Sequence, residues 1–220
     1  MTHLLPSTLR TCFCLGLTLL IFSWATGAPA ATIWNEAVSG DLSNDQSAPN
    51  ALGLSVGTNS IIGTVGGLNQ KDFVALTVPA GDVLTSIILT AYSSGDAQGF
   101  TGVQAGASFV GNAETASPYL GYVHFGTGAT NGALPPTNLI GQDLLPLMGN
   151  KTLAVGSAGF TAPLPAGTYT FLIQQLGATT SYQFDYHVAQ VPEPATIWLL
   201  AIGVVGFATR MPTGVRPRIT

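Results

Sequence analysis

The chain has 220 residues and a formal net charge of −4, and only 7% of its residues are charged while 46% are hydrophobic. We expect no nucleic-acid partner, because binding a phosphate backbone needs clustered Lys and Arg side chains. The two cysteines, Cys12 and Cys14, lie near the N-terminus, so residues 31–190 hold no thiol for a disulfide, a zinc-thiolate site or a cysteine nucleophile.

The first thirty residues have the layout of a secretory signal peptide. A weakly basic start at residues 1–10 precedes an apolar stretch at 12–22, and Ala28-Pro29-Ala30 has the small-x-small pattern of a cleavage site. We therefore expect signal peptidase to remove residues 1–30, with Ala28 and Ala30 as the residues that it recognises. The protein is then exported, and its mature chain starts at Ala31.

Residues 31–190 predict one all-β domain, a single antiparallel β-sandwich or jelly roll of nine or ten strands. The segment is long enough for a sizeable core, and turn residues recur about every eight to twelve positions between stretches of alternating apolar residues. The predicted strands are 32–38, 52–56, 61–65, 73–78, 83–92, 103–110, 119–125, 169–173 and 182–188. Only residues 138–148 are a candidate for a short helix. Nine acids and two lysines give this segment a net charge of −7.

Two stretches of this domain share one local design. Residues 71–81, followed by Leu84, and residues 164–171 each combine an aromatic-bearing strand with a Pro-Ala-Gly corner. Both are similar to the core hairpin of bacterial pre-peptidase C-terminal-like sandwiches. The resemblance implies an accessory binding or folding domain and no catalysis.

The loop after the first predicted strand offers oxygen ligands for a cation. Asp41, Asn44 and Asp45 supply two carboxylates and an amide, and backbone carbonyls could complete the roughly six to eight oxygens that calcium prefers. Further acids that could join from neighbouring turns are Glu36, Asp72, Asp82 and Asp96. Two interpretations stay open, a weak structural calcium site and an ordinary turn, because Asp and Asn also form turns through their own side chains. No other cofactor is expected.

A serine motif in the same region matches a catalytic pattern. Residues 53–57 fit G-x-S-x-G, and Ser55, Asp143 and His187 follow the chain order of an α/β-hydrolase triad. That nucleophile elbow needs a strand, a turn and then a helix, whereas a further strand follows here. We therefore interpret Ser55 as a polar strand residue and predict no catalytic residue. His124 and His187 are not spaced as a metal pair and are expected at the sheet rim or on its solvent face.

The C-terminus combines a short polar motif, an apolar stretch and a basic end. The motif occupies residues 191–196, residues 195–209 carry no charge, and Arg210 opens a basic tail at 210–220. The four residues predicted to be recognised for sorting are Val191, Pro192, Glu193 and Pro194. As a helix, the uncharged stretch is about 22 Å long, so we predict a marginal transmembrane helix with Arg210 as its membrane stop. Arginines on that side favour a cytoplasmic C-terminus and place residues 31–190 outside the cytoplasm.

This order of Pro-Glu-Pro, apolar helix and arginine resembles the PEP-CTERM sorting signal. The resemblance implies processing by a membrane-bound exosortase, in bacteria that make exopolysaccharide. Because Pro192 and Pro194 keep the motif extended, a processing enzyme has access to it. A plain C-terminal anchor with a proline hinge is the alternative that the residues leave open.

Together these features predict a non-catalytic exported protein of the cell surface or extracellular matrix. The tail is expected to hold it transiently in the inner membrane, and exopolysaccharide or a biofilm matrix is the expected surrounding. A carbohydrate-binding module is the main alternative, because sugars stack on aromatic faces and the domain offers Trp34 and several tyrosines. A polysaccharide-acting hydrolase needs a pair of carboxylates on one cleft, for which the sequence has no signature.

Overall fold

The computed structural model of the protein describes residues 30–67, 70–116 and 118–192. Five predicted features lie outside these residues, namely Ala28, the motif residues Glu193 and Pro194, the transmembrane helix 195–209 and the basic tail with Arg210. In the part of the chain that is described, no helix is long and apolar enough to cross a membrane.

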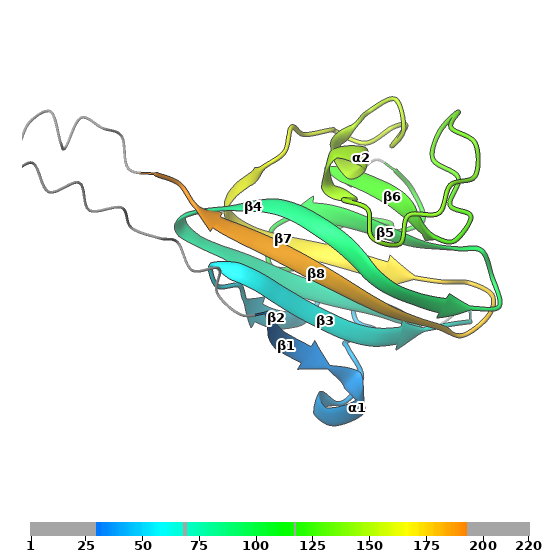
Figure 1. The fold of residues 1–220 in the computed structure, drawn as a ribbon, viewed down its shortest axis with the longest axis horizontal. Coiled ribbons are helices and arrows are strands. Elements are labelled where there is room, and N and C mark those ends of the chain that lie inside the picture. Colours follow the sequence, from blue (N-terminus) through cyan, green and yellow to red (C-terminus); the bar gives the residue numbers. More distant parts are fainter. Residues whose placement is uncertain (1–29, 68–69, 117, 193–220) are drawn as a thin grey trace, which may run out of the picture.

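The described chain is mostly β-strand, which confirms the prediction of a β-rich fold (Figure 1). The strands are β1 (Ala31–Asn35), β2 (Asn50–Gly53), β3 (Gly57–Val65), β4 (Lys71–Ser94), β5 (Gln98–Ala105), β6 (Gly121–Gly126), β7 (Leu164–Gln174) and β8 (Thr180–Gln190). Two short helices interrupt them, α1 (Glu36–Ser39) and α2 (Leu145–Gly149).

The eight strands form one hydrogen-bonded sheet with the order β1-β3-β8-β4-β7-β5-β6, and β2 pairs with β4. Two of the pairs, β1 with β3 and β2 with β4, are parallel, so the prediction of a wholly antiparallel sheet is wrong for the N-terminal segment. The number of predicted strands was also too high. The stretches 73–78 and 83–92 belong to one strand, β4, which continues through the Pro-Ala-Gly corner.

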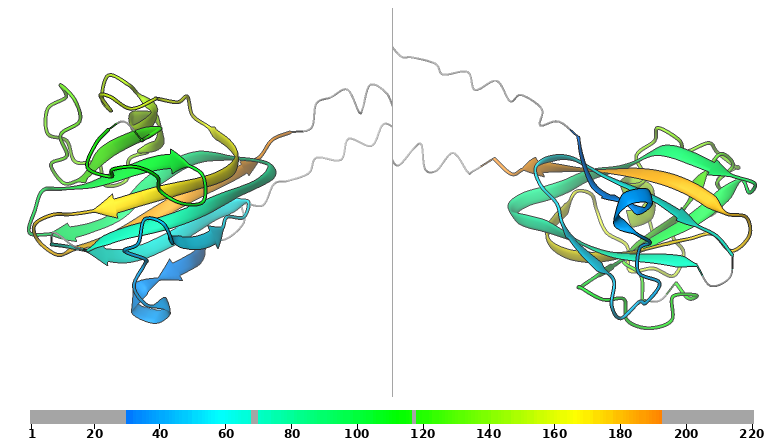
Figure 2. Two further views of the ribbon diagram at one scale, coloured as in Figure 1. Left: turned by 180° about the vertical axis from the view of Figure 1, so that it is seen from behind. Right: turned by 90° about the horizontal axis from the view of Figure 1, so that it is seen from below.

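Strand β4 belongs to both parts of a bent sheet, because it pairs with β7 and with β8. Its register with β7 runs from Lys71 to Val78 and is shifted before Val83, where pairing with β8 has begun. At the shift, Gly81 has a φ of 87°, which a residue with a side chain rarely adopts. Figures 1 and 2 show β4 turning at one end of the molecule, so that the part of the sheet with β3 and β8 lies over the part with β7, β5 and β6.

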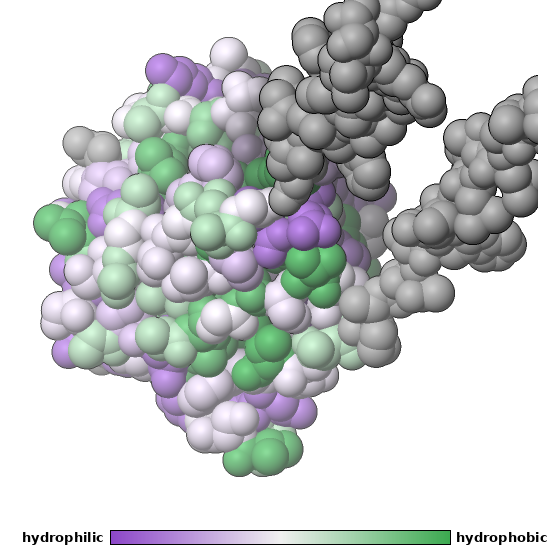
Figure 3. Space-filling model, turned by 90° about the vertical axis from the view of Figure 1, so that its left-hand side faces the viewer, coloured by the Kyte–Doolittle hydropathy of each residue, from purple (hydrophilic) through white to green (hydrophobic). Residues whose placement is uncertain are grey.

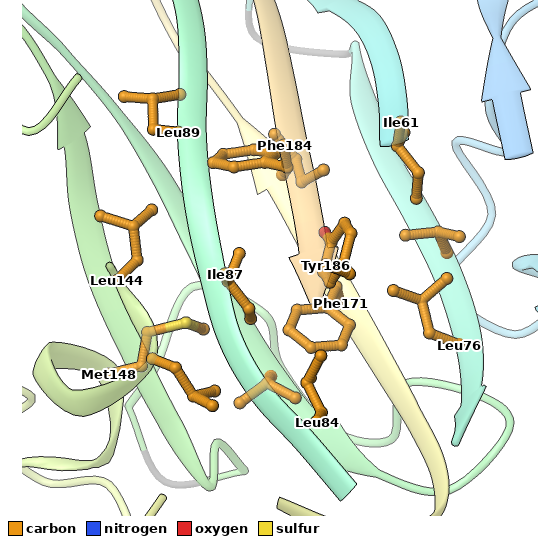
Figure 4. Close-up of a cluster of buried hydrophobic side chains, with 14 of the residues drawn as sticks. Ile61, Leu76, Leu84, Ile87, Leu89, Leu144, Met148, Phe171, Phe184 and Tyr186 are labelled. Atoms are coloured by element: carbon orange, nitrogen blue, oxygen red, sulfur yellow. The ribbon is translucent and has the colours of Figure 1, made fainter. Parts of the chain in front are cut away.

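Most of the core lies between these two parts of the sheet. Phe171 of β7 contacts Tyr186 of β8 with ring centroids 5.5 Å apart, and Phe125 of β6 contacts Phe184 of β8 at 5.0 Å. Figure 4 shows the rings of Phe171, Phe184 and Tyr186 near Ile87, with Leu144 and Met148 on the side next to α2. Alternation in β7 and β8 therefore brings their apolar faces together, as period two requires.

A smaller apolar cluster lies apart from this core. It consists of Phe73, Phe109, Ala113, Tyr119 and Leu172, with Phe100 and Tyr122 packed against it. The loop between β5 and β6 supplies three of its members, Phe109, Ala113 and Tyr119. That loop replaces the end of the predicted strand 103–110, because the chain leaves β5 at Gly106 with a φ of 112°.

One of the two helices, α2, was predicted, and the other, α1, was not. Helix α2 lies largely within the predicted window of 138–148. Helix α1 replaces the end of the predicted strand 32–38, because Asn35 caps it by accepting a hydrogen bond from the backbone N–H of Ala37. Gly40, with a φ of 87°, then ends the helix.

Candidate functional site

Three carboxylates from the N-terminal segment and β4 meet in one cluster. Glu36 opens α1, Asp41 follows that helix, and Asp72 is the second residue of β4. One carboxylate oxygen of each residue lies within 4.8 Å of those of the other two. We call these three residues the carboxylate cluster.

The fold of the N-terminal segment explains why these residues meet. The indole of Trp34 donates a 3.1 Å hydrogen bond to the carbonyl of Gly40, which closes the turn that contains Glu36 and is followed directly by Asp41. The loop that follows is joined to β4, because the backbone N–H of Phe73 donates to the carbonyl of Ser43 at 2.8 Å. This link brings Asp41 alongside Asp72.

Asp72 is fully buried, with a relative exposure of 0%. Its Oδ2 accepts a 2.5 Å hydrogen bond from the hydroxyl of Tyr182, whereas Oδ1 has no hydrogen-bond partner among the described residues. The pKa of Asp72 is raised from 3.8 to about 8, chiefly because the group is buried; the hydrogen bond from Tyr182 opposes the shift, and the charges of Glu36 and Asp41 add to it.

Glu36 is half-buried and held by the backbone. Its Oε1 accepts from the N–H of Leu42 at 3.0 Å, and its Oε2 accepts from the N–H and the hydroxyl of Thr64 at 2.6 and 3.0 Å. Burial nevertheless raises its pKa, with a smaller contribution from the charge of Asp41. Asp41 is exposed, so the cluster is open to solvent on that side.

Of the three residues predicted as calcium ligands, one lies in the carboxylate cluster and two lie outside it. Asp41 lies with two of the further acids considered, Glu36 and Asp72. Asn44 accepts from the backbone N–H of Lys71 at 3.2 Å, and the exposed Asp45 accepts from the N–H and hydroxyl of Ser47 at 2.9 and 2.7 Å. These bonds lower the pKa of Asp45, and neither residue belongs to the carboxylate cluster.

A second arrangement involves aromatic and amide side chains on neighbouring strands. His124 of β6, Phe100 of β5 and Gln174 of β7 are paired in register across the sheet. The Phe100 ring lies 5.5 Å from the rings of both Tyr122 and His124. Two hollows, of about 250 and 190 Å³, are both lined by Phe100 and Gln174. We call Phe100, Tyr122, His124 and Gln174 the aromatic row.

Gln174 makes the aromatic row chemically unusual. The residue is only 7% exposed, and its Oε1 has no hydrogen-bond partner among the described residues. A buried amide oxygen without a partner is available to a hydroxyl donor. Burial also lowers the pKa of His124, which favours its neutral imidazole.

A larger hollow of about 490 Å³ lies beside α2. The described residues that line it include no aromatic ring. One of them, Asp143, uses its Oδ1 to accept from the backbone N–H groups of Ile87 and Leu145, both at 3.0 Å. This carboxylate therefore holds α2 to β4.

The residues of the serine motif have structural partners. Ser55 bonds to Asn59, and the ring of His187 bonds to the hydroxyl of Thr58 at 3.0 Å. No hydrogen bond joins any two of Ser55, Asp143 and His187 among the described residues.

Val191 and Pro192, which open the predicted sorting motif, are exposed and follow β8 directly. The backbone N–H of Val191 donates to the carbonyl of Gly81 at 2.9 Å, so the motif begins where the folded domain ends. Residues 190–211 match the model of the PEP-CTERM protein-sorting motif.

The match implies an exported protein that carries a C-terminal, membrane-associated sorting signal and is processed by an exosortase. The predicted sorting motif is thereby confirmed. A comparison with curated proteins gives no match. The similarity of the β domain to pre-peptidase C-terminal-like sandwiches stays a prediction.

Proposed function

We propose that the protein is a non-catalytic component of the cell surface or extracellular matrix, associated with exopolysaccharide or biofilm. The observation that carries the proposal is the PEP-CTERM motif immediately after the last strand of the domain. In this proposal the bent sheet acts as a β-sandwich or jelly-roll scaffold. The C-terminal segment holds it in the inner membrane until an exosortase cuts near Pro192-Glu193-Pro194.

The position of the ends of the domain and the polarity of its surface support this role. The first residues of β1 and the last residues of β8 lie toward the same end of the molecule, at the left in Figure 1. That end faces the viewer in Figure 3, where pale, weakly polar surface is mixed with separate green and purple residues. A sparsely charged, polar surface suits a hydrated polysaccharide environment better than recognition by strong electrostatic attraction.

Measuring the intact mass of the native protein in membrane and extracellular fractions tests the proposal. We expect a released species that starts near Ala31 and ends near Pro194. Replacing Pro192 and Pro194 by Ala should keep the protein in the membrane fraction, whereas Pro212→Ala, outside the matched segment, should leave release unchanged. A native protein that remains membrane-bound and ends at Thr220 would contradict the proposal.

A carbohydrate-binding module is the second candidate, and the aromatic row favours it. Rings beside a buried, unpartnered amide oxygen combine an apolar platform with a hydrogen-bond acceptor, and binding sites have this composition. We expect retardation of the protein in gels containing its exopolysaccharide, and about tenfold weaker retardation for Tyr122→Ala. Gln142→Ala, in the larger hollow without rings, serves as the control. Equal effects of the two substitutions would reject a site at the aromatic row.

A polysaccharide-acting hydrolase has less support. Retaining and inverting glycosidases need two carboxyl groups that reach the substrate from opposite sides. In the carboxylate cluster, Asp72 has a pKa suited to an acid but is fully buried, and both oxygens of Glu36 accept from the backbone. We therefore expect no release of reducing ends from exopolysaccharide by the purified protein.

A further inference from the structure

We propose that Glu36, Asp41 and Asp72 together bind one calcium ion, which fastens α1 and the loop after it to the start of β4. The inference rests on the geometry of the carboxylate cluster and does not depend on the sorting of the protein.

The distances within the cluster fit a calcium ion. Three oxygens no more than 4.8 Å apart can share a centre that lies about 2.8 Å or less from each of them, close to the roughly 2.3–2.6 Å of calcium–oxygen bonds. Magnesium needs about 2.0–2.1 Å and a near-ideal octahedron, so it would require a larger contraction of the cluster.

The buried oxygen of Asp72 independently indicates a missing partner. Oδ1 receives no hydrogen bond from the described residues, although Asp72 is fully buried and its carboxylate lies next to those of Glu36 and Asp41. Burying a carboxylate oxygen without a partner is costly, and placing the carboxylate beside two others adds repulsion. A divalent cation among the three reduces both costs, because it supplies the partner and compensates two of the three negative charges.

The chemistry of the ligands selects a hard cation. The cluster offers carboxylate oxygens and contains neither His nor Cys, so it favours calcium over zinc or copper. The backbone N–H groups that bond to Glu36 fix the orientation of its carboxylate. Asp41 is exposed and leaves a side on which water can complete the coordination shell.

The test measures calcium binding to the full-length protein in detergent after removal of metal by a chelator. Titration calorimetry should show one calcium ion per chain. The Tm should rise by roughly 5–10 °C at a calcium concentration about 100 times Kd. Magnesium at the same concentration should give a clearly smaller rise.

Three matched substitutions locate the site. Asp41→Asn removes an exposed ligand and should weaken calcium binding by about tenfold or more without lowering the metal-free Tm, because it also removes like-charge repulsion in the cluster. Asp72→Asn should abolish binding, with the metal-free protein folded. Asp45→Asn is the control, because it removes the same charge from the same loop but lies outside the carboxylate cluster.

Two results would overturn the proposal. One is the lack of both a calcium isotherm and a calcium-dependent Tm in the unmodified protein. The other is calcium binding that Asp45→Asn weakens as strongly as Asp41→Asn does, which would place the ion in the exposed part of the loop. Neither result bears on the release of the protein from the membrane.

Discussion

The hydroxyl of Tyr182 donates a 2.5 Å hydrogen bond to Oδ2 of Asp72 inside the protein, where both side chains are buried. Tyr182 lies on β8 and pairs with the second part of β4, whereas Asp72 lies in the first part of β4 and pairs with β7. The hydrogen bond therefore connects the two parts of the bent sheet.

Removing the donor should destabilise the protein. Tyr182→Phe leaves both oxygens of Asp72 without a hydrogen bond, and we expect a loss of about 1–3 kcal/mol in the free energy of unfolding. Chemical denaturation in the presence of a chelator measures this loss. The control is Tyr122→Phe, whose hydroxyl bonds to the exposed carbonyl of Val155, and its effect should stay below about 0.5 kcal/mol. Equal losses for the two variants would contradict a special role of the buried bond.

The carboxylate cluster should make stability dependent on pH when metal is absent. Because the pKa of Asp72 is raised from 3.8 to about 8, the folded protein retains a proton that the unfolded chain has already released in this range. Its contribution to stability is full below pH 4 and is lost as the pH rises to about 8. The raised pKa of Glu36 acts in the same direction.

Denaturation curves between pH 4 and pH 8 in a chelator check this dependence. The Asp72→Asn variant should lose less stability over this range than the unmodified protein, by up to several kcal/mol. The lowered pKa of His124 has the opposite effect, but it is present in both proteins and cancels in the comparison. Parallel curves for the two proteins would show that Asp72 titrates normally.

Gly63 provides the space that Tyr182 occupies. The two residues are paired in register between β3 and β8, and a Cβ at Gly63 would overlap the phenol of Tyr182. We expect Gly63→Ala to cost about 1–3 kcal/mol of stability, because the buried ring must move and its bond to Asp72 is disturbed. Thermal unfolding measures the cost, and Gly53→Ala, where a Cβ meets nothing within 4 Å, should be nearly neutral. A neutral Gly63→Ala would show that the ring has room to shift.

Asp143 is expected to contribute stability and no catalysis. Asp143→Ala removes the acceptor of two backbone N–H groups, those of Ile87 and Leu145, and should destabilise the protein by about 1–2 kcal/mol. Asp143→Asn keeps an acceptor oxygen and should recover most of the loss. If both variants were as stable as the unmodified protein, the link between α2 and β4 would have no energetic importance.

The fold class could be predicted from the sequence because alternation in segments such as 182–188 is a local property. The count of strands could not, since Pro79-Ala80-Gly81 looks like the end of a strand and only the pairing with β7 and β8 keeps β4 continuous. The helix α1 had a local signal that the alternation of 32–38 concealed, namely Asn35 as a cap and Gly40 as a terminator.

The candidate sites depended on longer-range information. Asp41 was predicted as a ligand from its loop, but the burial of Asp72 depends on Tyr182, which is 110 residues away in the chain. An aspartate at the start of the apolar run 73–78 was the one local hint of a buried acid. The sorting motif was readable in full, because an exosortase substrate carries its signal in a short contiguous segment.

The position of β8 has a mechanical consequence. This strand pairs antiparallel with β3 on one side and with β4 on the other, and the sorting motif follows its last residue. A pull through the C-terminal tether acts along β8, while its ladder hydrogen bonds lie across the strand. Such a force shears both ladders together and cannot open them one bond at a time. The tethered domain should therefore resist unfolding, when the surrounding polymer drags on it, better than a hairpin pulled open from its ends.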